Sequence, residues 1–122
     1  MRRDQRGAVT AETAVVLPLL VAVTLAMVWL VVVGLAQMRA TDAAREAARA
    51  LARGESVGRA EELARQAAPG VGVRVVRADG EVRVVVDQHL AAPDGVLGHL
   101  PGAGVHAEAT ALDEGAVGAP AP

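Results

Sequence analysis

The stretch GAVTAETAVVLPLLVAVTLAMVWLVVVGLA, residues 7–36, decides the fold of this chain. From Thr13 to Ala36 it contains no charged residue. As a helix rising about 1.5 Å per residue, that run is about 36 Å long, which exceeds the ~30 Å hydrocarbon core of a bilayer. A helix also satisfies its own backbone hydrogen bonds, as lipid requires. The stretch therefore predicts one membrane-spanning helix near the N-terminus.

The residues around this run argue for a membrane span and give it an orientation. The chain has 122 residues, and the part outside the run is too small to bury such a helix in a soluble core. A secretory signal has an apolar region of about 7–15 residues, roughly half of this length. Arg2, Arg3 and Arg6 precede the run, so we expect a cytoplasmic N-terminus and an extracytoplasmic remainder.

A glycine and a glutamate mark the start of the span. Gly7 ends a short basic leader, and Glu12 follows five residues later at the edge of the apolar helix. A carboxylate at a membrane boundary is costly unless it is paired, so Glu12 is a functional candidate. The alternative is that Glu12 only complements the dipole of the helix N-terminus. Pro18 removes one backbone hydrogen bond and crowds the carbonyl of Ala14, which predicts a kink.

The leader, Gly7 and Glu12 together resemble the type IV prepilin cleavage site. In that family a membrane-embedded aspartyl peptidase cuts after the glycine, and the glutamate is the fifth residue of the mature protein. The resemblance implies cleavage between Gly7 and Ala8, with release of residues 1–7. It also implies that Glu12 meets the freed amine of Ala8, commonly that of a neighbouring subunit. Ala8 stands where many type IV pilins have Phe.

Two further segments resemble TadE-like proteins. Residues 12–18, ETAVVLP, place a proline six residues after the glutamate, and residues 43–49 read AAREAAR. The resemblance implies a minor pilin or pseudopilin that serves assembly of a Flp-type type IV pilus, the tight-adherence (Tad) system. The implied partners are the prepilin peptidase, the major Flp-type pilin, other minor pilins, the pilus assembly platform and membrane lipid.

Strong helix formers continue beyond the span, so residues 37–68 are predicted to be helical. Gly54 is expected to end the first helix, and Ser56 to cap a second helix that stops at Pro69-Gly70. Apolar residues of the second helix fall at core spacing: Ala60, Leu63, Ala64 and Ala67. A stripe of small residues on the first helix either packs on another helix in an assembly or covers the strands that follow: Ala40, Ala44, Ala47, Ala48 and Leu51.

The periodicity then changes to alternation, which predicts strands. Three sets of alternating residues stand out: Val71, Val73 and Val75; Val82, Val84 and Val86; and the segment 105–112. Residues 78–80 form the expected hairpin turn, and residues 93–104 a loop rich in Gly and Pro. The fold class is α+β and pilin-like, with a transmembrane helix that continues outward and packs on a small antiparallel sheet.

The predicted boundaries follow from these patterns. They are a prepilin-type leader at 1–7, a transmembrane helix at 8–36, an extracytoplasmic helical region at 37–68, a sheet at 69–114 and a disordered tail at 115–122.

Composition argues against several kinds of chemistry. The chain has no Cys, and the spacing of His89, His99 and His106 fits no zinc motif. The net charge is −2 at pH 7, which gives no bulk attraction to nucleic acid. We find no arrangement typical of catalysis, so we expect neither an enzyme nor a bound cofactor or metal.

The sequence alone is compatible with three functions. The first is a minor pilin processed after Gly7. The second is an uncleaved single-pass anchor with a small extracytoplasmic protein-binding module. The third is a secreted protein with a long signal sequence. The mature N-terminus separates them, because it would be Ala8 in the first case, Met1 or Arg2 in the second, and a residue near Gln37 in the third.

Overall fold

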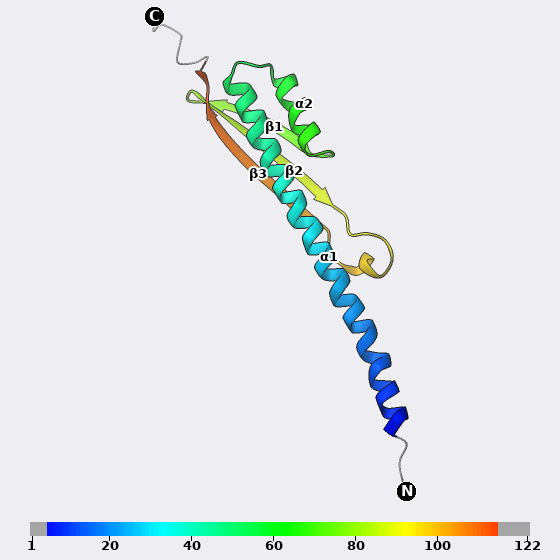
Figure 1. Ribbon diagram of the computed structural model, residues 1–122. Helices are drawn as coiled ribbons and strands as arrows, with labels where there is room; N and C mark the ends of the chain where they lie inside the picture. The colour runs from blue at the N-terminus through cyan, green and yellow to red at the C-terminus, as the bar shows by residue number, and fades with distance from the viewer. Residues whose placement is uncertain (1–4, 115–122) are drawn as a thin grey trace, which may run out of the picture.

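The computed structural model describes residues 5–114, and its fold is α+β as predicted. The elements are α1 (Gln5–Ala52), α2 (Val57–Ala67), β1 (Gly72–Ala78), β2 (Glu81–Leu90), the 3-10 helix η1 (Gly95–His99) and β3 (Ala103–Leu112). Figure 1 shows the N-terminal half of α1 projecting away from the other elements, which gather around its C-terminal half. The predicted tail at 115–122 and the first four leader residues lie outside the described residues.

The membrane run and the alanine-rich segment form one helix of 48 residues. It ends at Ala52, and Gly54 follows with a φ of 84°. The N–H of Gly54 donates to the carbonyl of Leu51 at 3.0 Å, and the N–H of Glu55 donates to that of Ala50 at 3.1 Å. This pair of bonds is a Schellman motif, which requires a left-handed residue and therefore favours glycine. The predicted C-terminal cap is confirmed.

The second helix begins as predicted, with one change in its buried face. Ser56 caps α2, and its hydroxyl accepts a hydrogen bond of 3.2 Å from the N–H of Arg59. Ala60 and Ala64 are fully buried. Ala67 was expected in the core, but it is exposed and Ala68 is buried instead. The reason is that the helix stops at Ala67, and the extended backbone of Ala68 turns the next methyl group inward.

The sheet is antiparallel with the strand order β1-β2-β3. Asp79 and Gly80 join β1 to β2 with φ values of 54° and 77°. Positive φ at both central residues is the signature of a type I′ turn, whose twist matches that of the paired strands. Alternation predicted the inward face correctly: Val82, Val84 and Val86 on β2 are fully buried, and so are nearly all of Val105 and Ala107 on β3.

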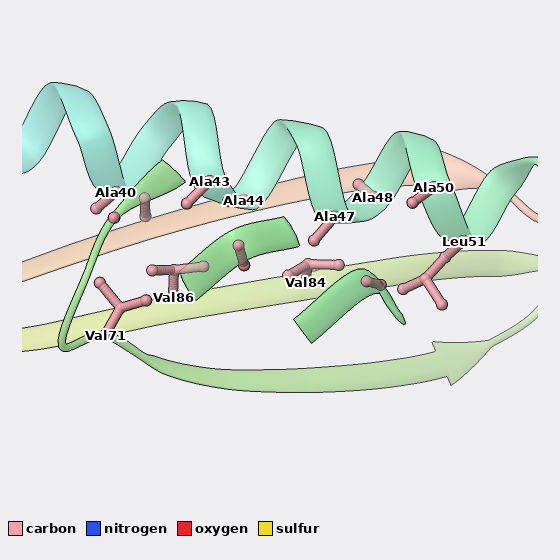
Figure 2. Close-up of a cluster of buried hydrophobic side chains, with 14 of the residues drawn as sticks. Ala40, Ala43, Ala44, Ala47, Ala48, Ala50, Leu51, Val71, Val84 and Val86 are labelled. Carbon is pink, nitrogen blue, oxygen red and sulfur yellow. The ribbon is translucent and has the colours of Figure 1, made fainter. Parts of the chain in front are cut away.

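The alanine stripe of α1 is buried by the same chain. Figure 2 shows Ala40, Ala44 and Ala47 facing the β2 residues Val84 and Val86. α1 contacts β2, β3 and α2 in this region, and Ala60 and Ala64 of α2 belong to the same core. Small side chains let the helix approach closely, so a core of Ala and Val fills without any large aromatic residue. Of the two uses predicted for the stripe, the structure shows the second.

Candidate processing and membrane-anchoring site

The N-terminal half of α1 lies free of the folded module. Its apolar stretch is long enough to cross a membrane, and none of its most apolar 18-residue window is buried. The core helix of a soluble protein would be covered by its neighbours, whereas Leu17, Leu19 and Leu20 are all exposed. α1 therefore has the length, composition and exposure of a single-pass membrane anchor.

The threonines of this segment have their hydroxyl groups satisfied within the helix. Thr10 donates to the carbonyl of Arg6 at 2.7 Å, Thr13 to that of Val9 at 2.9 Å and Thr24 to that of Leu20 at 2.8 Å. Each bond runs back one turn, which is how Ser and Thr are accommodated where no water is available. The threonines consequently do not argue against burial of the segment in lipid.

Gly7 and Ala8 lie in the first turns of α1, which begins at Gln5. A Cβ atom added at Gly7 would meet no atom within 4 Å, and Gly7 does not have a positive φ. In a helix interior, alanine is more favourable than glycine by about 1 kcal/mol. Nothing in the described structure around Gly7 therefore requires a glycine at this position.

Glu12 is exposed on the same side of α1 as Ala8, because residues four apart are neighbours on a helix. Among residues 5–114, its carboxylate has no ion-pair partner. It borders a shallow hollow of about 270 Å³, which is lined otherwise by Val9, Thr13, Val16, Leu17 and Leu20. A carboxylate in such apolar surroundings would be costly to place in lipid without a cation beside it.

Pro18 lies within α1, and the helix runs through it without a break. It has no N–H to donate to the carbonyl of Ala14, so the helix lacks one internal hydrogen bond there. The kink at Pro18 stays a prediction.

The comparison with protein families matches residues 7–49 of this chain to the model described as TadE-like protein. This segment is TadE-like. The resemblance stated from the sequence is thus confirmed for the segment that holds Gly7, Ala8, Glu12 and Pro18, together with the alanine stripe of α1. A TadE-like segment is typical of a Tad-pilus-associated protein and not of an enzyme family. The TadE-like match stops before α2 and the sheet. Comparisons with curated proteins and with solved structures gave no match.

Two features of the structure were not predicted. The side-chain amide of Gln37 binds the main-chain carbonyl of His106, which joins α1 to β3. Trp29 is nearly buried although it lies in the apolar run. The sequence marked Trp29 only as the single aromatic residue. As for metal binding, residues 5–114 contain no group of three or more His, Cys, Asp or Glu side chains placed to hold an ion.

Proposed function

We propose that this protein is a minor pilin or pseudopilin for assembly of a Flp/Tad-type pilus, and that a prepilin peptidase cleaves it after Gly7. The observation that carries the proposal is the TadE-like match of residues 7–49, which begins at Gly7. The open space around Gly7 supports it, because the glycine is then explained by a protease subsite that excludes a side chain. The prepilin peptidase is accordingly the first partner.

Cleavage would also supply the missing partner of Glu12. It creates a protonated amine at Ala8, one helical turn before Glu12, where none exists in the uncleaved chain. The amine of the same chain or that of a neighbouring subunit can reach the carboxylate. An ion pair of this kind offsets the cost of placing a carboxylate in an apolar environment. The pair would orient each subunit as it joins the growing fibre.

The remaining partners follow from the same role. The exposed apolar face of α1 would rest in lipid before assembly and then pack against the major Flp-type pilin and other minor pilins. The pilus assembly platform would move the subunit between these two environments. The basic residues at the start of the chain favour a cytoplasmic N-terminus, so the module of α2 and the sheet would lie on the extracytoplasmic side.

An uncleaved anchor is the alternative, and one observation favours it. The bond between Gly7 and Ala8 lies inside a continuous helix. Peptidases bind extended backbone, so the first turns would have to unwind before cleavage. In this alternative the module recruits another envelope protein while α1 only tethers it.

The mature N-terminus decides between these functions. The full chain is co-expressed with a prepilin peptidase and its intact mass is measured. The proposal expects a protein that starts at Ala8. A chain that keeps its leader would support the uncleaved anchor, and one that starts near Gln37 would indicate an ordinary signal sequence.

A matched pair of variants tests the role of the glycine. Gly7→Leu should abolish processing, whereas Gly34→Leu should leave it intact. Gly34 is a fair control because it lies in the same helix and an added Cβ there also meets nothing within 4 Å. Processing of Gly7→Leu at the normal rate would contradict cleavage by a prepilin peptidase.

A further inference from the structure

Trp29 is the most protected residue of the projecting part of α1. Its side chain is 9% exposed, while those of its neighbours Val28 and Leu30 are 53% and 68% exposed. Leu25, Ala26 and Val33 are also less exposed than the residues around them. These positions lie on one face of the helix, since they are separated from Trp29 by three or four residues. Other parts of the protein therefore cover this face of α1, on the N-terminal side of the main core.

The connection between β2 and β3 lies beside this part of the molecule and contacts α1. It spans residues 91–102 and contains η1, which contacts α1. Figure 1 shows η1 beside the middle of α1, next to the end of the sheet that lies nearer the N-terminus of α1 and beyond α2. The main core begins only at Ala36 and Ala40 on α1. The connection thus reaches along the apolar helix toward the membrane.

This connection cannot enter the hydrocarbon core. It consists of irregular backbone apart from η1, and Asp94 and His99 are exposed. Backbone N–H and C=O groups outside a helix or closed barrel are not tolerated where they face lipid. A carboxylate facing lipid adds a further cost of several kcal/mol. The depth of the connection therefore limits how far α1 can sink.

Helix length leaves room for such a limit. Residues 8–36 would be about 44 Å long as a helix, whereas the hydrocarbon core is about 30 Å thick. Residues 8–29 would be about 33 Å long, which fits the core with little tilt. The longer span would draw η1 below the outer surface, but the shorter one would leave it outside.

The geometry points to an outer membrane boundary at Trp29, with the β2–β3 connection lying on the lipid headgroups of the outer leaflet. The connection is then a membrane-contact surface, and Trp29 takes the interfacial position that tryptophan favours. The proposal rests on the anchoring role of α1, but it depends neither on cleavage nor on pilus assembly. It replaces residue 36 by residue 29 as the outer end of the span.

Spin labels on single cysteines can measure this boundary, because the chain has no cysteine of its own. Suitable sites are exposed on α1: Leu20, Met27, Val31, Leu35 and Met38. The full chain is placed in phospholipid vesicles, and collision of each label with oxygen and with a water-soluble nickel complex is compared. Nickel accessibility should be low at Leu20 and Met27 and should rise several-fold between Met27 and Val31.

The other outcomes distinguish failure of the proposed boundary from failure of the anchoring role of α1. If nickel accessibility stays low through Leu35 and rises only at Met38, α1 spans the membrane but the boundary at Trp29 is wrong. If every site is accessible, α1 does not enter the bilayer and the anchoring role fails.

The fluorescence of Trp29 gives a second measurement that needs no label. Trp29 is the only Trp in a chain without Tyr or Phe, so all aromatic emission comes from this site. Lipids brominated near the headgroup should quench it more strongly than lipids brominated near the chain end. The opposite order would overturn the proposal.

Discussion

The side-chain amide of Gln37 donates a hydrogen bond of 2.7 Å to the main-chain carbonyl of His106. Gln37 directly follows the apolar run of α1, and His106 lies on β3, opposite Asp87 of β2. The bond joins residues 69 positions apart in the sequence. It holds the sheet against the helix where the folded module begins, so it helps to fix the height of the module along α1.

Replacing Gln37 by alanine should therefore weaken the module. The side chain is exposed, so we expect a loss of about 0.5–1 kcal/mol in the free energy of unfolding. Urea unfolding of the full chain in detergent micelles, followed by far-UV circular dichroism, measures it. Gln66→Ala is the control, because the side chain of Gln66 donates to Glu62 one turn away on the surface of α2. Equal losses in the two variants would show that the contact between helix and sheet has no special role.

Enlarging the alanine stripe should be more damaging. Ala47 is fully buried against the sheet and α2, and Ala47→Leu would add three carbon atoms to a packed core. Overpacking of this kind costs about 1–3 kcal/mol. Arg45→Leu makes a comparable apolar side chain on the exposed side of the same helix and should change stability by about 0.5 kcal/mol or less. If Ala47→Leu is as stable as Arg45→Leu, the stripe is not packed as the structure shows.

Two glycine-to-alanine substitutions, one in the turn between β1 and β2 and one in α2, should change stability in opposite directions. Gly80 has a φ of 77°, where an L side chain is strained, so Gly80→Ala should destabilise the protein by about 1–2 kcal/mol. Gly58 lies in the first turn of α2 with open space around it, so Gly58→Ala should stabilise the protein by up to about 1 kcal/mol. Thermal unfolding of both variants provides the comparison. A stabilising Gly80→Ala would argue against the type I′ turn.

The sequence predicted those parts of the fold that depend on local chemistry. Ser56, Gly54 and the Asp79-Gly80 pair act on the backbone next to them, so their effects can be read without knowledge of the tertiary structure. The alanine stripe was recognised, but its partner was not, because small residues suit contact with a helix of another subunit as well as with a sheet. The cover over Trp29 could not be predicted at all. It depends on which segments distant in the sequence lie beside the helix, and no periodic pattern indicates that.

The residues of the candidate site could likewise be identified from the sequence, but their surroundings could not. Gly7, Glu12 and Pro18 could be identified because their spacing at the start of an apolar run is unusual. The structure adds that nothing around Gly7 requires a glycine and that Glu12 has no ion-pair partner between residues 5 and 114. The sequence could not show either point, since both concern what surrounds a side chain in space.

Glu12 provides the last prediction, which separates cleavage from assembly. Under the proposed function, Glu12→Leu should leave processing largely intact, because the peptidase would recognise Gly7, five residues before Glu12. The variant should reduce the yield of assembled pili strongly, since no carboxylate would remain to bind the amine of Ala8. Mass spectrometry measures cleavage, and the pili sheared from cells measure assembly. Glu12→Asp keeps the charge on a shorter side chain and should retain part of the yield. Normal pilus yield from Glu12→Leu would remove the ion pair from the assembly mechanism and leave Glu12 with no more than a favourable interaction with the helix dipole.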